Sequence, residues 1–135
     1  MNALSIAQAL LLANSGVTAL ANTRIAAVAA PQKWAMVRPQ IILHQISNRD
    51  IPTLLGAGKY YRTIVQTDCN GDTPKQSIDL GDAAIECLNG VIKATVGTAI
   101  DVDSLLGETD FTEFDDLSGS YRRVIQFALW WRLGS

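Results

Sequence analysis

The stretch Tyr121–Ser135, YRRVIQFALWWRLGS, has the alternation of a β-strand, yet both of its faces are largely apolar. Successive side chains along a strand point to opposite faces of the sheet. One face would carry Ile125, Phe127, Leu129 and Trp131, and the other Val124, Ala128 and Trp130. A chain of 135 residues forms about two layers around one core, which cover one face of a sheet but not both. The second apolar face therefore predicts a partner, and the commonest partner is another copy of the same chain.

The composition indicates one globular domain whose surface is partly used for association. Hydrophobic residues make up 48% of the chain, which is enough for a core. Charged residues make up only 18%, against about 25% in an average domain. The net charge of −2 and the pI near 5.2 give no reason to expect nucleic-acid binding.

The charges are distributed unevenly between the two halves of the chain. Residues 1–67 contain six basic side chains and one acidic side chain, whereas residues 68–135 contain five basic and twelve acidic ones. If the halves present different surfaces, identical copies can meet head to tail, which is the geometry that closes rings. If strands from both halves interleave in one sheet, the asymmetry is instead internal to the domain.

Two features resemble processing or redox signals but have simpler interpretations. The apolar run Leu4–Ala13, followed by the A-x-A pattern at Ala19–Ala21, looks like a signal peptide, but no basic residue precedes it and Gln8 interrupts it. A core-facing helix is favoured, and the run is too short to span a membrane. Cys69 and Cys87 lack metal-binding spacing, which favours buried free thiols in a reducing compartment.

Periodicity and breaker residues predict the order of elements. We expect a helix at 3–13, a helical turn at 17–20, extended chain at 24–29, strands at 38–47 and 59–69, a helix at 74–94, a strand within 100–116 and a final strand at 121–132. Residues 48–58 are predicted to form a mobile connection, because Pro52, Gly56 and Gly58 interrupt it. Short loops join neighbouring strands, so the predicted fold class is α+β: a mostly antiparallel β-sheet of about four to five strands packed against two main helices on one face.

The second main helix has the clearest start signal. Asp72 or Thr73 can cap it, and Pro74 suits its first turn. Its apolar stripe is predicted at Ile78, Ala84, Ile85, Leu88 and Ile92.

Seven of the thirteen carboxylates lie within residues 101–116. Metal-dependent hydrolysis needs carboxylates that converge from different elements. On one strand, Glu108 and Asp110 would share one face, and Glu113 and Asp115 the other. No D-x-[DN]-x-[DN]-G calcium loop is present. A solvated acidic strand is therefore favoured over a metal site, and on the wall of a pore it would repel a phosphate backbone.

The remaining chemical candidates also have structural explanations. His44 is the single histidine, and nothing in the sequence places Cys69 or a serine beside it to complete a nucleophilic triad. Gly56–Lys59 lacks the full phosphate-loop pattern. The pairs Arg122–Arg123 and Trp130–Trp131 split between the faces of a strand, so core packing plus an interface explains them better than nucleic-acid stacking. The sequence predicts no catalytic residues, no metal and no cofactor.

Several short motifs, spread over most of the chain, occur in a recognisable order. They are Val17–Leu20 before Arg24-Ile25, Ala30–Gln32, Arg38-Pro39 opening a strand that ends at Ile46-Ser47, Arg62, Val65–Cys69, a helix after Thr73, acidic Glu108–Asp116, Tyr121-Arg122 and Phe127–Trp130. Their order and spacing resemble the phage tail-completion family, a DUF3168-type domain that includes tail terminator or tail-to-head joining proteins of long-tailed phages. The chain departs from this pattern at Ala26-Ala27, where an aromatic–proline pair is common.

The resemblance implies a structural virion protein, assembled in the bacterial host cytoplasm, that forms a homo-oligomeric ring, usually of six copies, at the head-proximal end of the tail tube. Such a ring ends tube polymerisation and joins tail to head. Its partners would be the tail tube protein and the head connector or head-completion protein. DNA would pass through the lumen without specific binding, and no membrane is involved.

Three groups of residues are the candidates for this assembly. Ring closure is expected through sheet edges and through the second apolar face of the last strand, with the interface at Val124, Gln126, Ala128 and Trp130. The acidic residues that would line the lumen or the subunit seam are Glu108, Asp110, Glu113 and Asp115. The connection 48–58 would dock on a neighbouring ring through Arg49, Asp50, Leu54, Leu55 and Lys59.

Three other interpretations stay open at this level. A head-side neck or head-completion adaptor of similar size would also form a ring. A small metal-dependent hydrolase would use the acidic run, with Asp101 or Asp103 as essential groups. A secreted binding module would require cleavage after Ala21.

Overall fold

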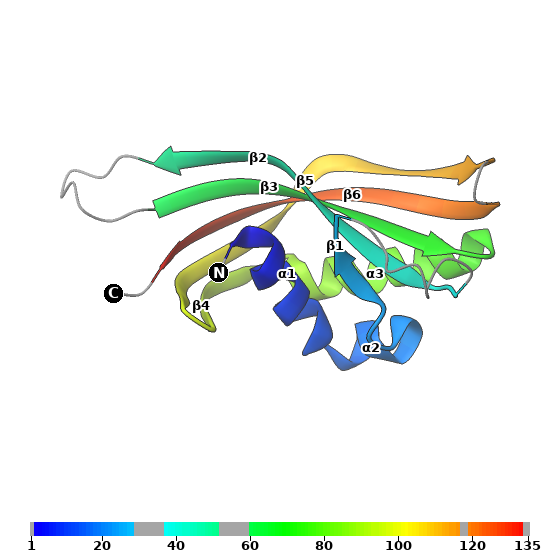
Figure 1. Ribbon diagram of the computed structural model, residues 1–135, viewed down its shortest axis with the longest axis horizontal. Helices are drawn as coiled ribbons and strands as arrows, with labels where there is room; N and C mark the ends of the chain where they lie inside the picture. The colour runs from blue at the N-terminus through cyan, green and yellow to red at the C-terminus, as the bar shows by residue number, and fades with distance from the viewer. Residues whose placement is uncertain (1, 29–36, 52–59, 117–118, 134–135) are drawn as a thin grey trace.

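Three helices lie on one face of a strongly twisted six-stranded sheet in the computed structural model, which describes residues 2–28, 37–51, 60–116 and 119–133 (Figure 1). In chain order the elements are α1 (Ala3–Leu12), α2 (Ser15–Ala21), β1 (Ile25–Ala27), β2 (Gln40–Ile51), β3 (Tyr60–Gly71), α3 (Pro74–Leu88), β4 (Val91–Val96), β5 (Ala99–Asp115) and β6 (Ser120–Leu133). The strands lie side by side in the order β1-β2-β3-β6-β5-β4.

The sheet agrees with the predicted α+β class but is larger and mixed. β1 pairs with β2 in parallel, and every other neighbouring pair is antiparallel. The prediction of four to five strands falls short because β1 and β4 are short. β1 has three residues and lies within the stretch predicted only as extended chain, and β4 begins within the stretch predicted as the end of the second main helix.

Each helix begins at a side chain that caps its free backbone N–H groups. Asn2 and Ser5 form a reciprocal capping box at the start of α1, and Asn14 caps α2. Thr73 caps α3 just before Pro74, as the sequence predicts. Among the described residues no single helix is long and apolar enough to cross a membrane. The pair α1 and α2 passes that test only together, and it is bent by 87° at the break.

The prediction that α3 runs to residue 94 is wrong. The helix ends at Leu88, and Gly90 has a φ of +90°, a left-handed conformation that suits glycine and turns the chain into β4. The predicted apolar stripe is correct at Ala84 and Leu88 but wrong at Ile78 and Ile92. Ile78 and Ile92 are exposed, whereas the residues of α3 that are fully buried include Leu80, Ala84 and Leu88.

The prediction of a mobile connection at 48–58 is wrong for its first four residues. β2 continues to Ile51, whose partner on β3 is Tyr60. Pairing with β3 gives this polar segment its backbone hydrogen bonds, so it needs no apolar alternation of its own. A bulge between Gln45 and Ser47 shifts the register and changes which side chains of β2 face the helices. Residues 52–58 lie outside the described residues.

The hydrophobic core lies between the helices and the face of β6 that carries Ile125, Phe127, Leu129 and Trp131. All four are buried, as the alternation predicts. The Trp131 ring stacks on Tyr61 with the ring centres 4.8 Å apart, and its indole N–H donates to the Thr63 hydroxyl at 3.0 Å. Each fully buried side chain of this size stabilises the fold by about 1.5–3 kcal/mol.

Both cysteines are free thiols. Cys69 is fully buried in the core, and burial raises the pKa of its thiol to about 12. Cys87 is half-buried on α3, and burial raises the pKa of its thiol as well.

Candidate assembly surface

The sheet face opposite the helices is covered by no other element of the described chain (Figure 1). We call it the open face. The four residues predicted to form the ring interface all point to this face, because they alternate with the core residues of β6; they are Val124, Gln126, Ala128 and Trp130.

The open face is not a uniform apolar surface. Val124 lies between Asp68 and Phe111 in the register, and it is only 2% exposed although no helix covers it. Ala128 lies between Ile64 and Leu105 and is also buried. Side chains on neighbouring strands therefore shield much of the predicted interface within one chain. Gln126 and Trp130 stay partly accessible.

A polar cluster occupies the middle of the open face and links four strands. The Asp68 carboxylate on β3 lies 3.1 Å from His44 Nε2 on β2 and 3.8 Å from an Arg122 nitrogen on β6. Gln66 donates to the same carboxylate at 3.0 Å, and Arg122 also pairs with Glu113 on β5. Asp68 is buried, so these partners replace the water that its charge has lost. His44 is thus held by a cross-strand acid, which fits the structural role predicted for it.

An apolar hollow of about 650 Å³ lies at one end of the open face. The apolar and aromatic residues that line it are Ile51, Tyr60, Val91, Ile92, Leu105 and Trp130. Asp103 is the charged residue of this lining. Ile92 is 74% exposed and Leu105 is 47% exposed, so the hollow presents apolar surface that the chain itself leaves uncovered.

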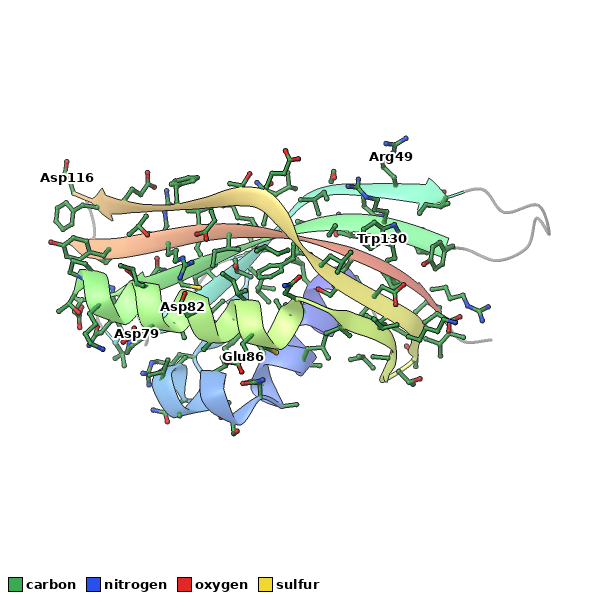
Figure 2. The ribbon with its side chains drawn as sticks, turned by 180° about the vertical axis from the view of Figure 1, so that it is seen from behind. Arg49, Asp79, Asp82, Glu86, Asp116 and Trp130 are labelled. Atoms are coloured by element: carbon green, nitrogen blue, oxygen red, sulfur yellow. The ribbon has the colours of Figure 1, made fainter. Side chains whose placement is uncertain are left out.

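Two arginines lie beside this hollow on the open face. Arg49 on β2 stands directly opposite Arg62 on β3, and the Arg62 guanidinium lies 5.6 Å from the centre of the Trp130 ring. Figure 2 shows Arg49 extending from β2 near the end of the sheet that carries Trp130. Neither arginine forms an ion pair with another described residue. Two like charges directly opposite each other are unfavourable, so this place attracts an anion.

The structure also corrects the predicted docking loop. Arg49 and Asp50 belong to β2, where their backbones pair with Arg62 and Tyr61 of β3. Leu54, Leu55 and Lys59 lie outside the described residues.

Arg123 joins β6 to β5 and to α3 on the covered face. Its guanidinium contacts both carboxylate oxygens of Asp110, at 2.9 and 2.8 Å. It also donates to Asp82 at 2.7 Å and to the carbonyl of Ile78 at 2.9 Å, both on α3. Gly81 makes room for this side chain, because a Cβ there would lie 2.5 Å from Arg123 Cδ. We call these residues the Arg123 cluster.

The contact between Arg123 and Asp110 shifts the pKa of both groups. The hydrogen bonds from Arg123 lower the pKa of Asp110 below its ordinary value. The same bonds raise the pKa of Arg123. Both shifts favour the charged forms, so the cluster holds its ion pairs throughout the neutral range.

The four predicted lumen or seam acids do not gather on one surface. Asp110 points to the covered face and Glu113 to the open face, as the strand alternation predicts. Both are paired with arginines of their own chain. Glu108 lies in the irregular stretch between Leu106 and Asp110 and is exposed. The Asp115 side chain lies outside the described atoms.

A row of acidic residues on α3 was missed by the sequence interpretation. Asp79, Asp82 and Glu86 lie along α3 in Figure 2. Their spacing of three and four residues was the available signal, because such residues share one side of a helix. Asp79 pairs with Lys75 and Asp82 with Arg123.

Besides the outer edges of the terminal strands β1 and β4, the long strands β2 and β5 each have a stretch of edge without a described neighbour. β1 covers β2 only at Ile41–Leu43, which leaves the rest of that edge open towards Ile51. β4 covers β5 only as far as Ser104, so Asp110–Asp115 pairs on the β6 side alone. Unpaired strand edges offer backbone hydrogen-bonding groups to another chain.

The acidic residues that a hydrolase would use are engaged elsewhere. Asp101 pairs with Arg132 at 2.7 Å, and Asp103 accepts a hydrogen bond from the backbone N–H of Lys93 at 2.7 Å. In the described parts of the chain, no three His, Cys, Asp or Glu side chains gather as a metal ion would require. Both acids thus have a visible structural role.

Comparison with known proteins identifies the fold through structure and not through sequence. No family model matches the chain, and no curated protein matches its sequence. Among solved structures, a chain from the virion of a native gene transfer agent particle is similar, with a TM-score of 0.69 at 13% sequence identity. The alignment covers 96% of this chain and 94% of that chain. The two chains therefore share a fold along nearly their whole lengths.

Proposed function

We propose that this protein is a structural virion protein that forms a homo-oligomeric ring at the head-proximal end of a phage-like tail tube. There it would stop tube polymerisation and join the tail to the head. The observation that carries the proposal is a one-sided sheet, whose open face keeps an apolar hollow and unpaired edges, in a fold shared with a chain of a gene transfer agent virion. The order and spacing of the sequence motifs resemble those of the tail-completion family. Among virion proteins, this resemblance favours the tail terminator.

The surfaces left uncovered in one chain favour a ring over a two-fold dimer. The apolar hollow and its arginines lie at one end of the sheet, whereas the exposed Asp116 lies at the other end of the molecule in Figure 2. Contacts between two different surfaces repeat head to tail, and such contacts close into rings. The tail tube and the head connector would then meet the two rims of the ring.

A structural role also suits the polar groups of the chain. The buried Asp68 and the half-buried Arg123 are engaged in ion pairs that link strands and helix. Such clusters fix the shape of a building block and leave few groups for acid–base chemistry. We therefore assign no catalytic residue and no cofactor.

Native mass spectrometry tests this function, first on the purified protein and then with its tail tube protein. A species of six copies, about 88 kDa for a 14.6 kDa chain, supports a closed ring. A monomer that forms a ring only on the tube means that docking triggers assembly. A monomer under both conditions contradicts the proposal. Binding to a portal-bound adaptor instead of the tube protein would place the ring on the head side of the joint.

A further inference from the structure

We propose that the seam between neighbouring copies forms when the far end of the β5–β6 hairpin of one copy enters the hollow of the next. We call this far end, residues 108–116 and 120–124, the acidic hairpin. Phe111 would be the apolar anchor, and Asp116 would face Arg49 and Lys93 of the neighbour. This inference rests on the proposed function, because it names the surfaces through which the ring closes.

The apolar parts of the two surfaces complement each other. Phe111 lies on the open face, opposite Val124, and is 48% exposed in the single chain. Phe114, on the other side of the same strand, is 51% exposed. The hollow has a volume of about 650 Å³, within the size range of pockets that bury whole small ligands, so an aromatic side chain fits inside it. Aromatic residues buried in pockets are the usual anchors of protein interfaces.

The two surfaces also carry side chains of opposite charge that are unpaired within the described chain. Asp103 in the lining of the hollow already accepts a hydrogen bond from the backbone N–H of Lys93. Arg62 contacts Trp130 of the hollow's lining, Arg49 stands opposite Arg62, and Lys93 follows Ile92 of the lining in the chain. None of these three side chains forms an ion pair with a described residue.

Asp116 is exposed at the end of the acidic hairpin (Figure 2), and Glu108 is exposed nearer the middle of β5. Neither acid forms an ion pair within the described chain. A second copy that brings Asp116 to the arginines relieves the repulsion between Arg49 and Arg62.

The two surfaces lie at opposite ends of one chain (Figure 2), so the contact between them is made by different copies. Figure 2 shows Asp116 at one end of the long axis, and Arg49 and Trp130 towards the other. One copy cannot fill its own hollow with its own hairpin, so the contact must be made between copies. His44 and Asp68 of the polar cluster lie outside both surfaces and already have their partners, and a face-to-face dimer would bury them without adding any.

A mixing experiment tests the seam, under whichever condition gives the wild-type ring. Ile92→Glu places a negative charge in the hollow, and Phe111→Ser removes the anchor; each variant alone is expected to remain monomeric by native mass spectrometry. In an equal mixture, the intact hairpin of the Ile92→Glu variant can enter the intact hollow of the Phe111→Ser variant. Both remaining surfaces of that pair are disrupted, so the mixture should give a dimer of about 29 kDa and no ring. Leu20→Ser, a similar change at an exposed site on α2, should leave the ring intact.

A charge exchange provides a second test that leaves the apolar groups in place. Arg49→Glu and Asp116→Arg should each reduce the ring fraction at moderate salt, and the double variant should restore it. Both positions are exposed, and circular dichroism tests whether the variants fold.

If the Ile92→Glu and Phe111→Ser variants each form rings as the wild type does, the seam lies elsewhere and the ring function stands. Rings or like-with-like dimers from the mixture also overturn the head-to-tail seam. A wild type that stays monomeric with the tail tube protein overturns the function and the seam together.

Discussion

Arg122 and Arg123 are neighbours in the sequence, yet they contact different elements because their side chains point to opposite faces of β6. Arg123 lies on the covered face, where it joins β5 to α3 and its side chain is 12% exposed. Arg122 lies on the open face, where its side chain is 36% exposed and links Asp68 to Glu113. The covered face thus uses an arginine to fix a helix to the sheet, and the open face uses one to complete a polar surface.

The same contrast holds for the apolar residues of β6. On the covered face, Ile125, Phe127 and Leu129 are buried under the helices. On the open face, Val124 and Ala128 are buried only by side chains of neighbouring strands. Apolar residues on both faces of a strand therefore do not require a partner along the whole strand. The apolar surface that stays exposed on the open face is concentrated at the two ends of the sheet.

The largest difference between the faces should appear when one phenylalanine is removed from each. Phe127→Ala creates a cavity in the core and should lower the free energy of unfolding by about 3–5 kcal/mol. Phe111→Ala on the open face removes a half-exposed ring and should change it by less than about 1 kcal/mol. Urea denaturation of both variants measures the difference. Equal losses would show that the open face is packed as tightly as the core.

The two arginines give the next largest contrast. Arg123→Gln leaves two carboxylates and the Ile78 carbonyl without their donor, which should cost about 1–3 kcal/mol of unfolding free energy. Arg122→Gln should cost less, because Asp68 keeps its contacts with His44 and Gln66. Thermal unfolding of the two variants under the same conditions ranks them. A greater loss at Arg122 would contradict the assignment of Arg123 as the link to α3.

A smaller effect is expected within the polar middle of the open face. Gln126 donates to Gln66 at 3.3 Å across two strands, and both side chains are half-buried. Gln126→Ala should lower the free energy of unfolding by roughly 0.5–1.5 kcal/mol, the usual contribution of one such hydrogen bond. It should leave the ring intact, because it lies outside both ends of the seam. Loss of the ring in this variant would show that the middle of the open face also takes part in assembly.

The smallest expected effect is on the pH dependence of stability. Because Arg123 lowers the folded-state pKa of Asp110, the unfolded chain takes up the proton first as the pH falls. The contribution of this ion pair is therefore present above about pH 4 and is lost as the pH falls through the folded-state pKa. Asp110→Asn should make the unfolding midpoint depend less on pH below about pH 4 than it does in the wild type. In an Arg123→Gln background the same substitution should have no such effect.

The sequence predicts the long elements of the fold because their signals are local. Alternation along β6 and the Thr73-Pro74 start of α3 are properties of a few neighbouring residues, and both predictions are confirmed. The overrun of α3 has a physical cause. Val91 and Ile92 continue an apolar helical spacing, but Gly90 and pairing with β5 override it.

The candidate site is harder to predict, since it depends on register. Arg49 and Arg62 are 13 residues apart, and only the bulge-shifted pairing of β2 with β3 places them opposite each other. The hollow collects Ile51 and Trp130 from elements that are far apart in the chain. The faces of Asp110 and Glu113 follow from alternation, whereas their arginine partners depend on which strand lies beside them. Side-chain shielding of Val124 likewise has no sequence signal.

Cys69 gives the folded chain a built-in chemical reporter. It lies fully buried on the central strand β3, and with a thiol pKa of about 12 it holds almost no thiolate at neutral pH. A thiol reagent can modify it only when the sheet separates from its helices, whereas the half-buried Cys87 needs only a local movement of α3. The ratio of the two labelling rates therefore measures how often the whole domain opens, in solution and inside an assembled particle, without any added dye or tag.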